Sequence, residues 1–155
     1  MKHSTFPVGI GIVLCLSLIL SGCGIRSIPT ALNEVEAAWS EVLNQYKRRS
    51  DLIPNLVNIV KGYAAHEKET LLAVVDARAK ATQTQVSTSQ LTPESLRQFS
   101  QAQAGLGSAL SRLMVVVERY PELKANENFR DLQVQLEGTE NRITVARYRY
   151  IQSIK

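Results

Sequence analysis

The amino-acid sequence predicts an all-α fold, an antiparallel bundle of long helices. Three observations support this prediction. The chain of 155 residues contains only eight Gly and three Phe, and it is rich in residues that favour helices. Apolar residues recur at alternating spacings of three and four along most of the chain, which is the period of an amphipathic helix. Three of these stripes are nearly equal in length and have short connections, which favours antiparallel packing.

The first 22 residues are predicted to be a lipoprotein signal peptide. The basic segment Met1-Lys2-His3 precedes an apolar run of 15 residues, Phe6–Leu20. A membrane-spanning helix needs roughly 20 such residues, whereas the apolar part of a signal peptide has about 7–15. The run ends in Leu20-Ser21-Gly22-Cys23, which resembles a lipobox. We therefore expect cleavage before Cys23 and a diacylglycerol on its thiol.

A lipid on Cys23 makes the membrane the first expected partner of the mature chain. Each buried methylene contributes about 0.8 kcal/mol, and stable attachment needs at least two acyl chains, which a diacylglycerol supplies. We expect a lipid-anchored envelope protein that faces the periplasm or the exterior. An Asp after the lipidated Cys commonly retains lipoproteins in the inner membrane, so Gly24 favours the outer membrane of a double-membrane bacterium. Cys15 leaves with the signal peptide, so no disulfide is expected.

Residues 23–29 are predicted to be a short tether, and helical periodicity begins at residue 30. One apolar stripe is interrupted by Arg49 and then resumes in phase. The unbroken phase predicts one helix that continues through Pro54 with a bend, because proline removes a hydrogen bond of the helix ladder. The alternative is a break near Ser50-Asp51, in which case the segment before the break folds back and closes a four-helix bundle.

Three matched rods of about 28 residues, or roughly 40 Å each, are predicted to form the body of the bundle. They are Ile53–Lys80, Pro93–Tyr120 and Asn128–Lys155. A loop rich in Thr, Gln and Ser over residues 81–92 separates the first two. The segment Thr92-Pro93-Glu94 is typical of a helix start, with Thr as the N-cap, Pro in the first turn and an acid near the positive end of the helix dipole. A proline after the second rod ends it.

Four segments of the chain resemble the LemA family. They read RRSDLIPNLV at 48–57, VKGYAAHE at 60–67, VERYPELKAN at 117–126 and LEGTENRITVAR at 136–147. The resemblance covers nearly all of residues 34–148. It implies a helical-bundle domain, here residues 30–155, that is held at a bacterial membrane, and it implies no enzymatic activity. Members usually have a transmembrane anchor and some tens of further C-terminal residues, so the lipobox and the end at Lys155 predict a lipid-anchored, shortened member.

No catalytic residue, metal site or cofactor is predicted. The pair His66-Glu67 resembles the start of a zinc-protease motif, but Thr70 stands where that motif needs its second His. The mature chain has no other His, and its one Cys is the expected lipid attachment site, so too few metal ligands are present. An enzyme of another type, built around His66 and Glu67, is the last of three alternatives.

The polar clusters of the predicted helices are candidates for an interaction surface. A net charge of +4 indicates mild attraction to anionic surfaces rather than nucleic-acid binding, and nucleic acid is not an expected partner outside the cytoplasm. The positive cluster Lys47-Arg48-Arg49 is explained either by a solvated helix face or by a surface that meets lipid headgroups or an acidic partner. Salt bridges between neighbouring helices explain the other clusters without a function, namely Glu118-Arg119 and Glu137, Glu140, Asn141 and Arg142. The candidate residues are Arg48, Arg49, Asp51, His66, Glu67, Arg119, Glu137, Asn141 and Arg142.

Composition and motifs together favour a non-enzymatic, membrane-anchored envelope protein that binds or scaffolds a protein partner. The alternative is a structural, membrane-shaping protein that self-associates through its long last helix. The two hypotheses use different surfaces of the bundle. Partner binding uses the polar clusters, and self-association uses the long last helix.

Overall fold

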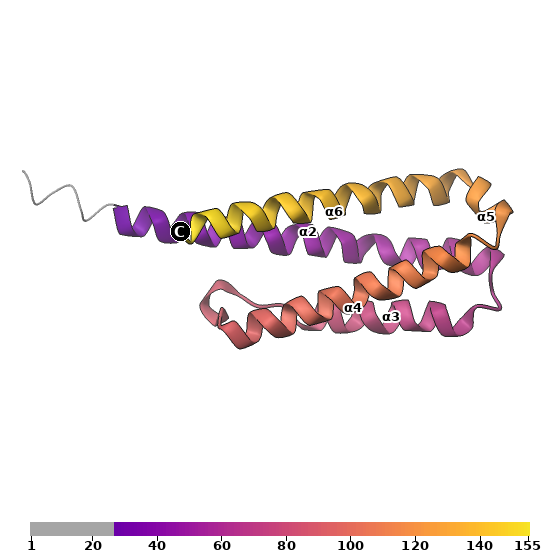
Figure 1. Ribbon diagram of the computed structural model, residues 1–155, viewed down its shortest axis with the longest axis horizontal. Helices are drawn as coiled ribbons and strands as arrows, with labels where there is room; N and C mark the ends of the chain where they lie inside the picture. Colours follow the sequence, from indigo (N-terminus) through magenta and orange to yellow (C-terminus); the bar gives the residue numbers. More distant parts are fainter. Residues whose placement is uncertain (1–26) are drawn as a thin grey trace, which may run out of the picture.

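A computed structural model describes residues 27–155, with side chains from Thr30 onward. The helices are α2 (Ser27–Tyr63), α3 (Lys68–Gln83), the short 3-10 helix η1 (Thr88–Gln90), α4 (Pro93–Val117), α5 (Pro121–Ala125) and α6 (Glu127–Ser153). No strand occurs in this part of the chain, and the all-α prediction is confirmed (Figure 1). The predicted signal peptide, Cys23 and the first residues of the predicted tether lie outside the described residues.

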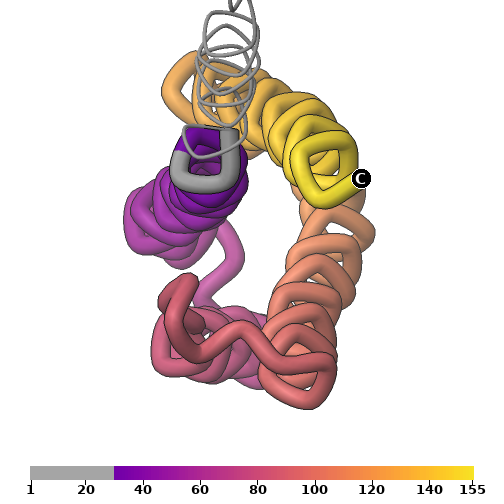
Figure 2. The backbone as a smooth tube through the Cα atoms, turned by 90° about the vertical axis from the view of Figure 1, so that its left-hand side faces the viewer, coloured from indigo at the N-terminus to yellow at the C-terminus, as the bar shows by residue number. Residues whose placement is uncertain are grey.

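The four long helices form an up-down-up-down bundle. In Figure 1, α2 runs antiparallel to α6, and α3 runs antiparallel to α4. The view along the bundle shows the order α2, α6, α4, α3 around the axis (Figure 2). The pairs α2–α6 and α3–α4 pack more extensively than α4 packs against α6. We call the end at which α2 begins the proximal end and the end that carries α5 the distal end.

The first described helix, α2, continues through Pro54, as the unbroken apolar phase predicts. Proline has no N–H to donate to the carbonyl of Ser50, four residues earlier. The structure supplies another donor, because Nε of Arg78 in α3 donates to that carbonyl over 2.8 Å. The helix also begins at Ser27, so residues 27–29, which the sequence assigns to the tether, are helical. A proline in this first turn is tolerated since its missing N–H has no partner within the helix.

The prediction of one continuous rod over Ile53–Lys80 is wrong, because the chain reverses direction between α2 and α3. The connection, residues 64–67, is closed by a backbone hydrogen bond of 3.0 Å from Glu67 N to Ala64 O. The apolar stripe stays in phase across this reversal, so periodicity alone does not distinguish a continuous helix from two helices and a tight turn. Of the two arrangements considered, the structure has the four-helix bundle. Its extra helix comes from this reversal and not from a break near Ser50-Asp51.

The start of α4 agrees with its predicted signal. The Thr92 hydroxyl accepts from Ser95 N over 3.0 Å, and the Ser95 hydroxyl accepts from Thr92 N over 2.9 Å, which completes a capping box.

The helix ends at Val117 rather than at Tyr120. The proline that follows begins the short helix α5 instead of a loop, because its fixed φ suits a first helical turn.

Two apolar cores fill the bundle. The proximal core is aromatic, with Trp39 ring centroids 5.6 Å from Phe99 and 5.0 Å from Tyr150, and Tyr46 5.1 Å from Phe99. Full burial of a large apolar side chain contributes about 1.5–3 kcal/mol, so both cores stabilise the fold. The distal core is largely aliphatic, and its fully buried members include Ile53, Leu56, Val60, Leu106, Leu113, Leu123 and Phe129.

Candidate functional site

A polar layer, formed by the buried side chains of Arg49 and Gln103, the carbonyl of Ala81 and the exposed carboxylate of Glu140, separates the two cores. On α2 and on α4, its residues follow the last aromatic of the proximal core and precede the first aliphatic residue of the distal core. Only 4% of Arg49 and 7% of Gln103 are exposed. A buried charge is costly unless it is paired, so the contacts of Arg49 decide whether this layer is stable.

The contacts of the polar layer link all four long helices. Nη1 of Arg49, in α2, donates to Oε2 of Glu140, in α6, over 2.8 Å. Nη2 of Arg49 donates to Oε1 of Gln103, in α4, over 2.8 Å and to the carbonyl of Gln103 over 3.2 Å. Nε2 of Gln103 then donates to the carbonyl of Ala81, in α3, over 3.2 Å. The guanidinium also lies 5.1 Å from the ring centroid of Tyr46, within cation–π range.

Arg49 is therefore buried, and its prediction as part of an exposed interaction surface is wrong. It occupies a position of the apolar stripe of α2, which by itself indicates that the side chain faces the interior. Its partners carry no local signal, since Glu140 lies 91 residues further along the chain. The alternative of a solvated helix face is also wrong for Arg49, whereas a salt bridge between helices, expected for the cluster that contains Glu140, is present.

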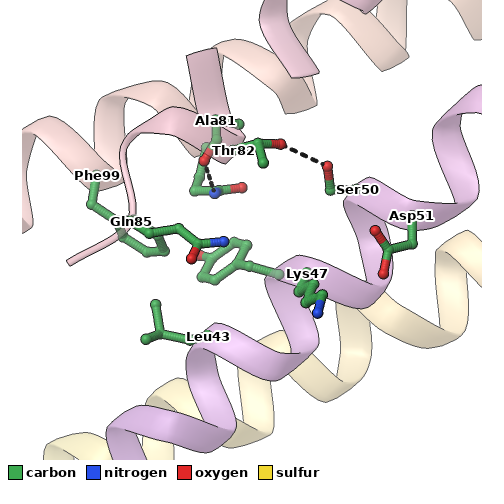
Figure 3. Close-up of a pocket in the computed structure, with 10 residues that line it drawn as sticks. Leu43, Lys47, Ser50, Asp51, Ala81, Thr82, Gln85 and Phe99 are labelled. Atoms are coloured by element: carbon green, nitrogen blue, oxygen red, sulfur yellow. Dashed lines mark hydrogen bonds between the residues drawn. The ribbon is translucent and has the colours of Figure 1, made fainter. Parts of the chain in front are cut away.

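A second set of polar contacts joins α2 to α3 beside the polar layer. The hydroxyls of Ser50 and Thr82 share a hydrogen bond of 3.1 Å, and Ser50 O also accepts from Arg78. Figure 3 shows the Ser50–Thr82 contact at the edge of a small cavity of about 80 Å³. This volume has room for a few water molecules, so the cavity is a packing gap between helices rather than a site for a substrate.

At the distal end, five side chains form what we call the distal cluster: Tyr63, Glu67, Arg119, Tyr120 and Asn126. Glu67 accepts from Nη2 of Arg119 over 2.8 Å and from the Tyr120 hydroxyl over 3.0 Å. Nδ2 of Asn126 donates to the Tyr63 hydroxyl over 3.0 Å. These bonds tie the α2–α3 connection to the segment between α4 and α6. The hydrogen bond to the Glu67 carboxylate, followed by burial and the negative charge, raises the pKa of Tyr120 above 10.0.

The other candidate residues do not gather into one site. His66 is exposed at the distal end, next to the distal cluster in sequence. The structure brings two of the candidates, Glu67 and Arg119, together. It also places Asn126, which was not a candidate, in the same cluster, because the chain reversal brings it there and no sequence pattern indicates that reversal. Exposed candidates away from this end are Arg48 and Asp51 on α2 and Glu137, Asn141 and Arg142 on α6.

The chemistry of the site is that of hydrogen bonding between helices. Within residues 27–155, no group of three His, Cys, Asp or Glu residues is placed to hold a metal ion. No helix in the described part of the chain has the length and apolar character needed to cross a membrane. The Glu67 carboxylate is occupied by Arg119 and Tyr120 and makes no hydrogen bond to His66.

Comparison with known families extends the resemblance seen in the sequence motifs. The model of the LemA family matches residues 38–155. The chain belongs to the LemA family. The matched part of this LemA protein contains the polar layer, the distal cluster and all of α3, α4, α5 and α6. A search of curated proteins gives no match.

Proposed function

We propose that this LemA protein is a lipid-anchored, non-enzymatic module of the bacterial cell envelope that presents its distal end to a protein partner. The observation that carries the proposal is the distal cluster, where charged and aromatic side chains are held in place by hydrogen bonds from three segments of the chain. A surface that is already ordered loses less side-chain freedom on binding.

The length of α2 supports the use of the distal end. The helix begins four residues after Cys23 and contains 37 residues, which corresponds to about 55 Å. A lipid on Cys23 fixes the proximal end at the bilayer surface. The distal cluster then stands away from the headgroups, at a height where a second envelope protein has access to it.

The side chains at this end are of the kinds that interfaces use. The Arg119 side chain is 63% exposed although it is paired with Glu67, and His66 is exposed. Tyr and Arg are enriched among the residues that dominate binding energies. A partner with carboxylates opposite Arg119 and an apolar surface opposite Tyr63 fits this end.

The proposal is tested by placing a photo-crosslinking side chain at His66 in the full chain, in cells, with the exposed Gln101 of α4 as the matched control position. A discrete protein should be cross-linked from position 66 and not from position 101. Arg119→Glu should remove this product, whereas Arg112→Glu, an equal charge change on α4, should keep it. Equal products from both positions, or none from position 66, would contradict distal-end binding.

The anchor is tested separately by mass spectrometry of the N-terminal peptide from the same cells. Acyl chains on Cys23 are expected, together with the loss of residues 1–22. An unprocessed or unacylated N-terminus would overturn the lipid anchor while leaving the partner experiment intact.

Self-association is the second candidate function, and one observation favours it. Three apolar residues of α6 are strongly exposed, Val134 at 67%, Val145 at 49% and Tyr148 at 62%, and their spacing puts them on one helix face. Such a stripe suits a helix from a second copy. Sedimentation of the full chain in lipid nanodiscs or detergent should then show a dimer that Val134→Glu converts to a monomer, and a wild-type monomer would exclude this candidate.

A further inference from the structure

A groove between α4 and α6 opens at the proximal end of the bundle. Its volume is about 450 Å³, within the roughly 300–1,000 Å³ typical of small-molecule sites. It exists because α4 and α6 each pack mainly against another helix and diverge from one another here. The groove lies at the opposite end from the distal cluster and is not used by the proposed partner binding.

The inner part of this proximal groove is apolar. Trp39, Val42 and Phe99 line it and are almost fully buried, at 2%, 1% and 3% exposed. Leu96 on α4 and Ile151 on α6 form its outer part and are 36% and 45% exposed. An apolar ligand placed here covers the parts of Leu96 and Ile151 that otherwise face water, which is favourable in proportion to the area removed from solvent.

Two arginines complete the proximal groove. Arg97 of α4 and Arg147 of α6 both line it, and both are exposed. Arg147 makes no ion pair with any described residue, and Arg97 has only a long contact of 3.5 Å to Glu94, with both side chains more than 60% exposed. Such an exposed pair contributes little, so exchanging Glu94 for the carboxylate of a ligand costs Arg97 little.

We infer that the proximal groove binds an anionic amphiphile with a single medium-length alkyl chain, a fatty-acid carboxylate. The carboxylate is held by the guanidinium groups of Arg97 and Arg147, and the alkyl chain lies over Trp39 and Phe99. The groove follows α4 from Pro93 to Ser100, about 10 Å, which is too short for a long chain. Its volume is also too small for the two chains of a phospholipid.

The charge of the lining distinguishes this groove from its neighbour. Further along the same two helices, a groove of about 390 Å³ is lined by Glu137, Glu140 and Arg49, and the charge of Arg49 is already paired with Glu140, which leaves the carboxylate of Glu137 in excess. Carboxylates at that position repel an anion, whereas the proximal groove has cations at its edge. Charge complementarity therefore selects the proximal groove for a carboxylate ligand.

The protein contains its own reporter for this site. Trp39 is the single Trp of the chain, it lines the groove, and its Nε1 is fixed by a hydrogen bond of 2.8 Å to the carbonyl of Val86. Its fluorescence is thus expected to respond to the contents of the groove. The test titrates the full chain, in nanodiscs of zwitterionic lipid, with decanoate while the Trp39 emission is recorded.

Decanoate should give a saturable change in the emission of Trp39. The affinity should rise about fourfold per methylene from hexanoate to decanoate and then level off as the chain outgrows the groove. Decanol, which has the same chain without the charge, should bind about 10–100-fold more weakly. The variant Arg97→Glu/Arg147→Glu should lose a similar factor, whereas Arg112→Glu, elsewhere on α4, should bind as the wild type does.

A groove-filling variant separates the site from general lipid effects. Ser100 is exposed and lines the groove, so Ser100→Leu should block decanoate while circular dichroism and thermal unfolding stay unchanged. Equal responses to decanol and decanoate, or an unchanged response in Arg97→Glu/Arg147→Glu, would overturn the inference. So would a change in Trp39 emission caused by anionic phospholipid alone, or the absence of any saturable response.

Discussion

Replacing Gln103 by Met tests whether the polar layer stabilises the bundle. Met has nearly the volume of Gln, so the substitution leaves little cavity and the lost hydrogen bonds dominate its effect. It removes a charge-assisted bond of 2.8 Å to Arg49, worth about 1.5–3 kcal/mol, and a neutral bond of 3.2 Å to the carbonyl of Ala81, worth about 0.5–1.5 kcal/mol. We expect the free energy of unfolding to fall by about 2–4 kcal/mol.

Urea denaturation of the full chain measures this loss, and thermal unfolding should show a midpoint lowered by about 8–16 °C at roughly 4 °C per kcal/mol. Gln101→Met is the matched control, because Gln101 is exposed on the same helix, and it should change stability by less than about 0.5 kcal/mol. The double variant Arg49→Met/Gln103→Met should lose less than the sum of the single variants, since the bond between these two side chains is counted in both single variants. A loss for Gln103→Met as small as for Gln101→Met would refute this account of the polar layer.

Three further predictions follow from contacts elsewhere in the bundle. Arg78→Ala should lower the free energy of unfolding by about 1–3 kcal/mol, because the buried carbonyl of Ser50 then has no donor, and urea denaturation against Arg112→Ala checks it. Glu67→Ala should bring the pKa of Tyr120 down toward 10.0, seen as earlier phenolate absorbance in a pH titration relative to the wild type. Since the folded-state pKa is the raised one, the contribution of this bond to stability is complete below pH 10.0 and is lost as the pH rises through the folded-state pKa. Trp39→Phe should speed amide exchange in residues 84–92 and leave α5, at the distal end, unaffected, because the indole N–H bond to that loop is removed.

Local rules predicted those features of the fold that depend on local chemistry. The helix start at Thr92 and the passage of α2 through Pro54 each follow from a few neighbouring residues, and both are confirmed. Gln103 and Thr139 occupy positions of the apolar stripes of α4 and α6, and both are buried, at 7% and 0% exposed. These successes come from periodicity and capping, which act over one or two helical turns.

Features that depend on the relative placement of helices could not be predicted in this way. The reversal at residues 64–67 preserves the apolar period, so it has no signature in the stripe. The partner of Arg49 is a residue on another helix, and no local pattern pairs it with Glu140. The proximal groove depends on how far α4 diverges from α6, which follows from the packing of both helices against other neighbours.

The pairing of α2 with α6 has a consequence for how the protein is made. The first described helix, α2, packs most extensively against α6, and α6 is complete only after a further 90 residues, from 64 to 153. At a synthesis rate of about 5–20 residues per second, roughly 5–18 s pass before this partner of α2 is complete. During that interval α3 covers part of the apolar stripe of α2, and the part that packs against α6 has no partner. The bundle therefore closes only after α6 has been synthesised, and the ion pair between Arg49 and Glu140 is among the last contacts to form.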